Sequence, residues 1–400
     1  MLEQVRIDDL QPGMYVNKVL EQTGSLKMRS KGIVKTQRII DSLKAKGILV
    51  VEVDSAKSKF ENAVTNAPSA PVEESKAESA PEKPKPMGRD AINEASDLYE
   101  NAVSIQSSFI KSLKKGAPKD LSPMESLSHS LIESVFDNKD ALSCLTMIKE
   151  ADQYLLEHSI NCSILAGIFC EFLGYDRDTI EQVSLGTLLM DIGMSSLPED
   201  VRVSTDTFSN DDWEVMKTHV EIGIDLIEQC GDISDLSLQI IEQHHERMDG
   251  SGYPKGLMGD DISEFARIAA IVDAFDAMTS NRTHKDSITP MQALKRLTAT
   301  ENLDQELVKQ FIQCIGVHPV GSLVRLKSGK LGIVSKANPK DPVNPQVMTF
   351  YSVTSQHFNE VKRIDLSLYE DEIVSGVRPE EFNLNLPKFF KDVFINQMPL

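Results

Sequence analysis

The stretch that constrains this chain most is His244-His245-Glu246-Arg247-Met248-Asp249-Gly250-Ser251-Gly252-Tyr253-Pro254. Two adjacent histidines suit a transition-metal ion, because neutral imidazole nitrogens bind Mn, Fe and Zn well. The residues that follow cannot continue a helix, since glycine permits positive φ and Pro254 fixes its own φ. The segment therefore predicts a helix that ends in metal ligands, followed by a tight loop that holds Tyr253 nearby. A buried histidine pair beside an ordinary turn is the alternative.

Length and composition bound the class of protein. A chain of 400 residues is too long for one compact core and indicates two or three domains. Its 40% hydrophobic and 26% charged residues are ordinary for a globular protein, and no run of about eighteen apolar residues predicts a membrane helix. Five widely spaced cysteines without a CxxC pair indicate reduced thiols that fill the core. We therefore expect a soluble, cytoplasmic protein that does not insert into a membrane.

The net charge restricts the partners. At −19 the chain repels long nucleic acid, so a role in binding a duplex is not expected. A small anionic ligand is still permitted, provided that a metal ion and a few local cations hold it.

The chain divides by composition into four segments. Residues 1–60 have the pattern of a small α+β module, and residues 61–89, rich in Pro, Ala and Glu, that of a disordered linker. Residues 90–316 show helical spacing throughout and predict an all-α bundle. Residues 317–400 predict an extension with short strands. The expected fold class is therefore mainly α, with small β-containing parts at both ends.

The expected elements follow from periodicity and turn residues. In the first module we expect strands at 5–7, 14–20 and 47–53 and a helix at 35–45. In the bundle we expect helices at 98–114, 124–136, 178–191, 210–229, 236–247, 262–278, 290–299 and 305–314, and either two helices or one long bent helix at 141–173. In the extension we expect strands at 320–326, 331–334 and 347–353.

Histidines and aspartates on separate expected helices are candidates for one metal centre. Asp191 and Asp273 each lie in an apolar run, where an unpaired carboxylate would be costly to bury and metal ligation would offset the cost. Single histidines are weak signals, since many are ordinary core or surface residues. The full candidate set is His158, Asp191, His219, His244, His245 and Asp273.

This set resembles the HD-GYP family, an all-α subgroup of the HD phosphohydrolases that hydrolyses cyclic di-GMP. The resemblance covers roughly residues 125–300, and residues 244–254 agree with the family pattern at every diagnostic position. The first sixty residues, with Asp9-Leu10-Gln11-Pro12-Gly13-Met14-Tyr15-Val16, are similar to a small domain often found ahead of HD-GYP modules.

The resemblance implies a centre of two or three iron or manganese ions that activates water for attack on phosphorus. A catalytic carboxylate, Asp191, would bridge two ions. The first ion would take His219, His244 and His245, and the second would take His158 and Asp273, although Asp276, one turn later, is an alternative to Asp273. The expected contacts to a cyclic dinucleotide are Tyr253, Arg282, Lys285 and Asp276, with Arg282 and Lys285 on phosphate.

The chain departs from the family pattern around the second ion. The histidine of the His-Asp doublet is Met190, and the lysine that usually follows is Met194. Tyr154 stands where some members have a glutamate, and the Arg-Pro-Tyr segment reads Arg282-Thr283-His284. A thioether is a poor ligand for Fe or Mn. We therefore expect one complete metal site and a second, impaired one.

Three functions are consistent with these residues. The first is a cyclic di-GMP phosphodiesterase whose activity survives the loss of the histidine. The second is an inactive receptor that binds the cyclic dinucleotide and signals through residues 1–60, the linker or a partner protein. The third is a metal-stabilised scaffold without affinity for nucleotides, against which the basic pair Arg282 and Lys285 argues.

Overall fold

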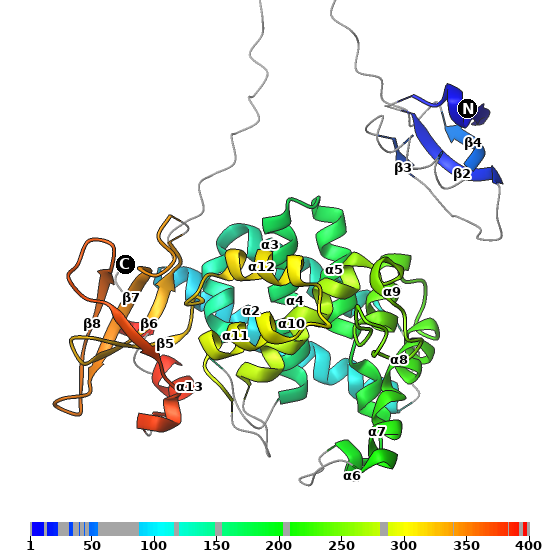
Figure 1. Cartoon of the computed structure of the whole chain (residues 1–400). Coiled ribbons are helices and arrows are strands. Elements are labelled where there is room, and N and C mark those ends of the chain that lie inside the picture. The colour runs from blue at the N-terminus through cyan, green and yellow to red at the C-terminus, as the bar shows by residue number, and fades with distance from the viewer. Residues whose placement is uncertain are drawn as a thin grey trace, which may run out of the picture. The chain divides into compact units, whose positions relative to one another are not determined.

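The structure, a computed structural model, forms two compact units, Met1–Ala80 and Pro81–Leu400 (Figure 1). It describes residues 2–11, 14–22, 32–34, 40, 44, 48–54, 88–115, 120–148, 154–202, 209–280, 287–338, 340–382, 384–391 and 395–397. The linker expected at 61–89 lies outside this range apart from its last two residues, and so does the helix expected at 35–45 apart from two positions.

The first unit is built on an antiparallel sheet. Its elements are β1 (Leu2–Arg6), the 3-10 helix η1 (Ile7–Asp9), β2 (Tyr15–Gln22), β3 (Gly32–Ile33) and β4 (Ile48–Asp54), and the strand order is β1-β4-β2-β3. Val51 and Val53 alternate with less buried residues along β4 and lie in a small apolar core with Val16. This alternation is what made the strands predictable from the sequence.

The second unit begins with a helical bundle. Its helices are α2 (Arg89–Lys114), α3 (Ser122–Thr146), α4 (Tyr154–Leu173), α5 (Arg177–Leu189), η3 (Ile192–Ser196), α6 (Glu199–Arg202), α7 (Asn210–Lys217), α8 (His219–Glu228), α9 (Asp235–Gln243), η4 (Gly259–Asp261), α10 (Glu264–Thr279), α11 (Pro290–Ala299) and α12 (Gln305–Ile315). The all-α prediction for this region is confirmed.

Helix α4 lies at the centre of the bundle, where α2, α3, α5, α10 and α12 all contact it (Figure 1). Its window Leu156–Leu173 is long and apolar enough to cross a membrane, but 78% of that window is buried inside the protein. A helix that is apolar on every face belongs in a core, so burial by its neighbours accounts for this composition.

The segment 141–173, expected as two helices or one long bent helix, is divided between the end of α3 and the whole of α4. Two other expected helices are shorter in the structure. The helix expected at 210–229 breaks at Thr218, so that His219 begins α8. The helix expected at 236–247 ends at Gln243, and both histidines of the pair follow it. At Thr218 the apolar spacing continues across the break, so periodicity alone does not locate it.

The C-terminal part is a five-stranded antiparallel sheet. Its strands are β5 (Leu323–Leu326), β6 (Lys330–Lys336), β7 (Gln346–Ser352), β8 (His357–Asp365) and β9 (Ile373–Gly376), in the order β8-β7-β6-β5-β9. Strands β5, β6 and β7 were expected, whereas β8 and β9 were not. Most side chains of β8 are exposed, and the strand lacks apolar alternation. The described residues that follow include the short helices η5 (Pro379–Phe382), α13 (Leu386–Phe389) and α14 (Ile395–Gln397).

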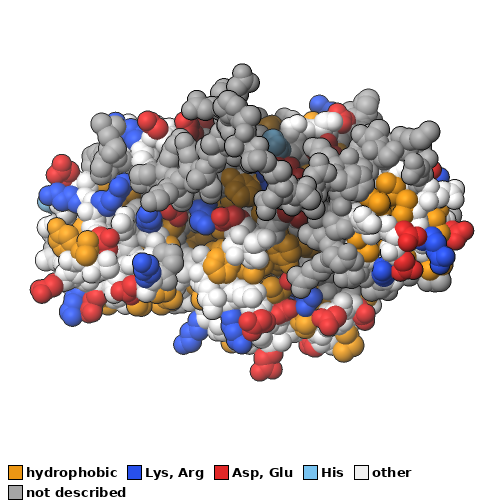
Figure 2. Space-filling view, turned by 90° about the horizontal axis from the view of Figure 1, so that it is seen from above, with side chains coloured by type: hydrophobic (Ala, Val, Ile, Leu, Met, Phe, Trp, Pro, Cys, Tyr) orange, Lys and Arg blue, Asp and Glu red, His pale blue; other side chains and the backbone are white. Residues whose placement is uncertain are grey.

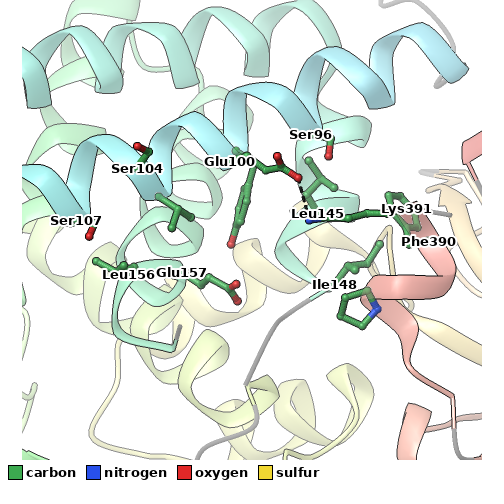
Figure 3. A pocket seen from close by; sticks show the side chains of 13 residues that line it. Ser96, Glu100, Ser104, Ser107, Leu145, Ile148, Leu156, Glu157, Phe390 and Lys391 are labelled. Carbon is green, nitrogen blue, oxygen red and sulfur yellow. Dashed lines mark ion pairs between the residues drawn. The ribbon is translucent and has the colours of Figure 1, made fainter. Parts of the chain in front are cut away.

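The sheet and the bundle share one hydrophobic core. Leu142 of α3, Val334 of β6 and Phe350 of β7 belong to the same buried cluster, which also includes residues of α2. On the side of α2, Lys391 forms an ion pair with Glu100 at 2.8 Å (Figure 3). The C-terminal strands are therefore part of the same compact unit as the helices.

Candidate metal centre

Six candidate residues from five segments of the bundle converge. His158 lies on α4, Asp191 directly after α5, and His219 at the first position of α8. His244 and His245 follow α9, and Asp273 lies on α10. Figure 1 labels the helices that carry or precede these residues. The donor atoms of Asp191, His219, His244 and His245 all lie within 4.8 Å of one another.

The tautomers of two histidines are set by the backbone. The Nδ1–H of His219 donates to the carbonyl of Met216 at 2.7 Å, and that of His244 donates to the carbonyl of Ile241 at 3.0 Å. Each ring therefore keeps a lone pair on Nε2. Both Nε2 atoms are buried, and neither has a hydrogen-bond partner in the described part of the chain.

These two lone pairs face the same carboxylate oxygen. Oδ1 of Asp191 lies 3.5 Å from Nε2 of His219 and 3.8 Å from Nε2 of His244. A nitrogen lone pair and a carboxylate oxygen repel each other when no hydrogen lies between them. A cation between the two atoms attracts both, so the arrangement becomes favourable. Donors about 2.1 Å from one ion lie roughly 3–4 Å apart, which is the separation seen here. The donor set fits a divalent transition-metal ion.

His245 and the loop after it form one wall of this centre. The ring of His245 lies 4.1 Å from that of His244 between centroids and stacks on Tyr253 at 4.6 Å. Glu246 holds the loop against the histidine pair. Its carboxylate is buried and accepts hydrogen bonds from the backbone N–H groups of Lys255 at 2.7 Å and Leu257 at 3.0 Å. Sequence reasoning gave Glu246 no role, although its place beside the pair was visible.

Gly252 is required where the loop folds back. A Cβ atom there would lie 2.5 Å from the backbone of Glu246, Arg247 and His245. No side chain fits at that distance, so only glycine allows this part of the loop to lie so close to the backbone of residues 245–247. This contact, together with a hydrogen bond from Tyr253 N–H to the His245 carbonyl at 3.3 Å, places Tyr253 over the histidines.

A second group of donors lies on the other side of Asp191. Nε2 of His158 is 3.1 Å from Oδ1 of Asp273 and 3.6 Å from Oδ2 of Asp191. Nδ1 of the same ring lies 2.7 Å from Oδ2 of Asp276. The two carboxylates of α10 therefore have different positions: Asp273 faces the centre, and Asp276 holds the far side of the ring.

The expected contact of Asp276 with substrate is not supported by its position. Its side chain is buried, and its Oδ2 lies within hydrogen-bond distance of two protein groups, His158 and Ser280. A carboxylate that accepts the Nδ1–H of a histidine fixes the tautomer and leaves Nε2 free for a metal ion. The neighbouring thiol, Cys162, is buried, and this burial raises its pKa to about 12, so it is a neutral core residue as expected.

The charges of the centre are set by its histidines. Burial alone would raise the pKa of Asp191, but the histidines outweigh it and hold that pKa well below the usual range for a carboxylate. Burial opposes ionisation of Asp273 too, yet His158 lowers its pKa to about 2. Burial lowers the pKa of His219 and, more strongly, that of His245. These shifts favour ionised carboxylates at Asp191 and Asp273 and neutral rings at His219 and His245, the forms that bind metal ions.

The residues that depart from the family pattern have clear environments. Met190 is fully buried in an apolar cluster of the bundle and contributes no donor to the centre. Met194 packs against a small apolar cluster with Leu197 and Met216. Arg282 and Lys285, the expected phosphate contacts, lie outside the described residues, as does the side chain of Tyr154.

Comparison with known proteins gives two family matches. Residues 143–307 match the HD domain family, and residues 2–124 match a domain of unknown function, DUF3391. The second match extends through α2, which lies in the same compact unit as the metal centre.

Several characterised proteins are similar over part or most of the chain. The cyclic di-GMP phosphodiesterase PA4108 of Pseudomonas aeruginosa is 27% identical over 365 residues, which cover 89% of this chain and 87% of that protein. The response regulator RpfG of Xanthomonas campestris, also a cyclic di-GMP phosphodiesterase, is 36% identical over 34% of this chain and 36% of its own length. Among solved structures, the HD-GYP-type protein Bd1817 of Bdellovibrio bacteriovorus is 18% identical with a TM-score of 0.46, over 78% of this chain and 98% of that one.

Proposed function

Because this chain belongs to the HD-domain proteins of the HD-GYP type, we propose that it hydrolyses a phosphodiester bond of cyclic di-GMP or a related cyclic dinucleotide. The observation that carries the proposal is the pair of buried, unpartnered Nε2 atoms of His219 and His244 that face Asp191. Imidazoles around an ionised carboxylate are a donor set that metal-dependent hydrolases use.

We propose iron or manganese as the metal, in one complete site and one impaired site. Asp191, His219, His244 and His245 would hold the first ion, whereas His158, Asp191 and Asp273 would hold the second more weakly. A bound divalent ion supplies an activated water molecule and stabilises charge on the phosphoryl oxygens. The impairment follows from Met190, whose side chain is directed into the apolar core.

The chain's own residues then hold the ligand and its protons in place. Asp276 accepts the Nδ1–H of His158, so Nε2 would be the atom of this ring that binds a metal ion. Burial raises the pKa of Tyr253, so its hydroxyl remains a neutral hydrogen-bond donor to the ligand at neutral pH. In the hydrolysis the water oxygen bonds to phosphorus, one P–O ester bond breaks, and the departing ribose oxygen gains a proton. Arg282 and Lys285 are the proposed phosphate contacts.

One observation favours the receptor as a second candidate function. With Met190 in the core, the second site has three protein donors at most. Loss of one ion would remove several kcal/mol of transition-state stabilisation without preventing binding. In that case the chain would report cyclic dinucleotide concentration in the cytoplasm to a partner protein.

A single set of variants separates these functions. The protein is purified with Mn²⁺ or Fe²⁺, metal per chain is measured, and cyclic di-GMP is followed for binding and for conversion to linear products. Turnover that is abolished by Asp191→Ala but unaffected by Asp178→Ala, an exposed aspartate on α5, supports the enzyme. Binding without turnover, with turnover gained in Met190→His, supports the receptor. Absence of both binding and turnover in every metal state overturns the proposal.

A further inference from the structure

A cavity of about 250 Å³ opens beside Asp191 on the side of α2. Its walls include Gln106, Lys111 and Lys114 from α2, and Met194 and Ser195 from η3. Helix α2 lies outside the HD match at 143–307 and inside the DUF3391 match at 2–124. One wall of a cavity at the candidate metal centre is therefore supplied by a helix that precedes the HD domain.

Two polar atoms buried at this cavity lack partners. The side chain of Gln106 is 2% exposed, and its Oε1 has no hydrogen-bond partner in the described part of the chain. The same holds for the Oγ of Ser195. Because nearly all buried polar atoms in proteins are hydrogen-bonded, two such atoms lining one cavity point to a bound polar ligand. A rotated amide can present either its oxygen or its N–H₂ group to that ligand.

Two cations line the same cavity. Lys111 and Lys114 are three residues apart on α2, so their side chains lie on one face of the helix. Neither makes an ion pair within the described residues, whereas Lys139 and Lys217 pair with acidic neighbours. Basic side chains also lie among acidic ones across the face drawn in Figure 2. In a chain of net charge −19, two unpaired lysines at one cavity favour an anionic group.

A larger cavity continues this one along α2. It has a volume of about 410 Å³, shares Ser107 and Leu156 with the smaller cavity, and extends past Tyr99 to Phe390 (Figure 3). Sites for whole small ligands span about 300–1,000 Å³, so the smaller cavity alone holds only part of a dinucleotide. The two together leave room for a phosphate and the nucleoside attached to it.

We propose that the smaller cavity is a phosphate subsite for the cyclic dinucleotide, with Lys111 and Lys114 contacting one phosphodiester group and Gln106 and Ser195 completing its hydrogen bonds. The inference rests on the proposed function. Met194, where the family pattern has a lysine, lines this cavity as well, so α2 restores positive charge close to the position where the HD domain lacks it. Part of the ligand site then depends on residues ahead of the HD domain.

The test uses the full chain loaded with Mn²⁺. The double variant Lys111→Gln/Lys114→Gln removes both charges at nearly constant length, and Lys115→Gln, exposed on the same helix end but outside the cavity wall, is the matched control. Calorimetry measures binding of cyclic di-GMP and 3'3'-cGAMP at two salt concentrations. We expect binding to weaken by roughly tenfold in the double variant, with a shallower salt dependence, while the control and the metal content stay unchanged.

A second variant separates a ligand contact from a structural role. Gln106→Leu removes a buried amide oxygen that has no partner among the described residues, so the thermal midpoint should stay constant or rise. Weaker dinucleotide binding in this stable variant supports the subsite, and unchanged binding in both variants overturns it while leaving the proposed function intact. If the metal-loaded wild-type chain binds neither dinucleotide, the subsite and the proposed function both fail.

Discussion

Replacing Asp276 with asparagine isolates the effect of one buried charge on the metal centre. The Nδ1–H of His158 and the hydroxyl of Ser280 both donate to the same oxygen, Oδ2, at 2.7 and 3.0 Å. An amide oxygen has two lone pairs and can accept both bonds. Asp276→Asn therefore keeps the shape and these two hydrogen bonds and removes the negative charge behind the ring.

The magnitude follows from the role of that charge. A carboxylate behind a ligating histidine makes the ring a stronger donor, and its loss typically costs 10–100-fold in metal affinity, or about 1.4–2.7 kcal/mol. The loss should fall on the second ion, because His158 faces Asp273 and the Oδ2 side of Asp191. The first ion, on the Oδ1 side with His219 and His244, should keep its affinity.

The assay is a Mn²⁺ titration followed by calorimetry and by metal content per chain. Asp178→Asn, an exposed aspartate on α5, serves as the control. We expect two classes of site in the wild-type chain and a weakened second class in Asp276→Asn. Unchanged metal binding together with weakened cyclic di-GMP binding would refute this reasoning and return Asp276 to the substrate contact expected from the sequence.

Three further outcomes are expected. Gly252→Ala should unfold the loop over the histidines and lower both metal content and thermal midpoint, whereas Gly223→Ala, whose Cβ would meet only contacts of 3.5 Å or more, should be tolerated. Met190→His should destabilise the metal-free chain by about 1–3 kcal/mol, because it buries a polar ring in an apolar cluster, and Mn²⁺ should restore the midpoint. The pKa values of His219 and His245 are lowered by burial, so below about pH 6.5 the unfolded chain binds more protons at these residues than the folded one. The thermal midpoint of the metal-free chain should therefore fall as pH drops from 7 to 5.5, and a rise would contradict neutral histidines.

Much of the architecture was predictable because local periodicity reports it. Apolar residues at helical spacing predicted the bundle, and alternation predicted the two small sheets. Strand β8 was not predicted, because its exposed side chains show no alternation of apolar and polar residues. Its pairing with β7 defines it in the structure. The break at Thr218 was not predicted either, because the apolar spacing continues from α7 into α8.

The metal-site residues show most clearly which features the sequence predicts and which depend on tertiary packing. From the sequence alone, the histidine pair, the glycine-rich loop and the carboxylates in apolar runs predicted a shared metal centre, because an unpaired carboxylate is costly to bury. It could not separate Asp273 from Asp276: residues three apart lie on one face of a helix, and periodicity treats them alike. Tertiary packing decided that Asp273 faces the centre, that Asp276 lies behind His158, and that α2 forms a wall of the adjoining cavity. Some of these contacts join residues roughly a hundred positions apart, and others join segments that no single sequence motif contains. Only the folded chain brings them together.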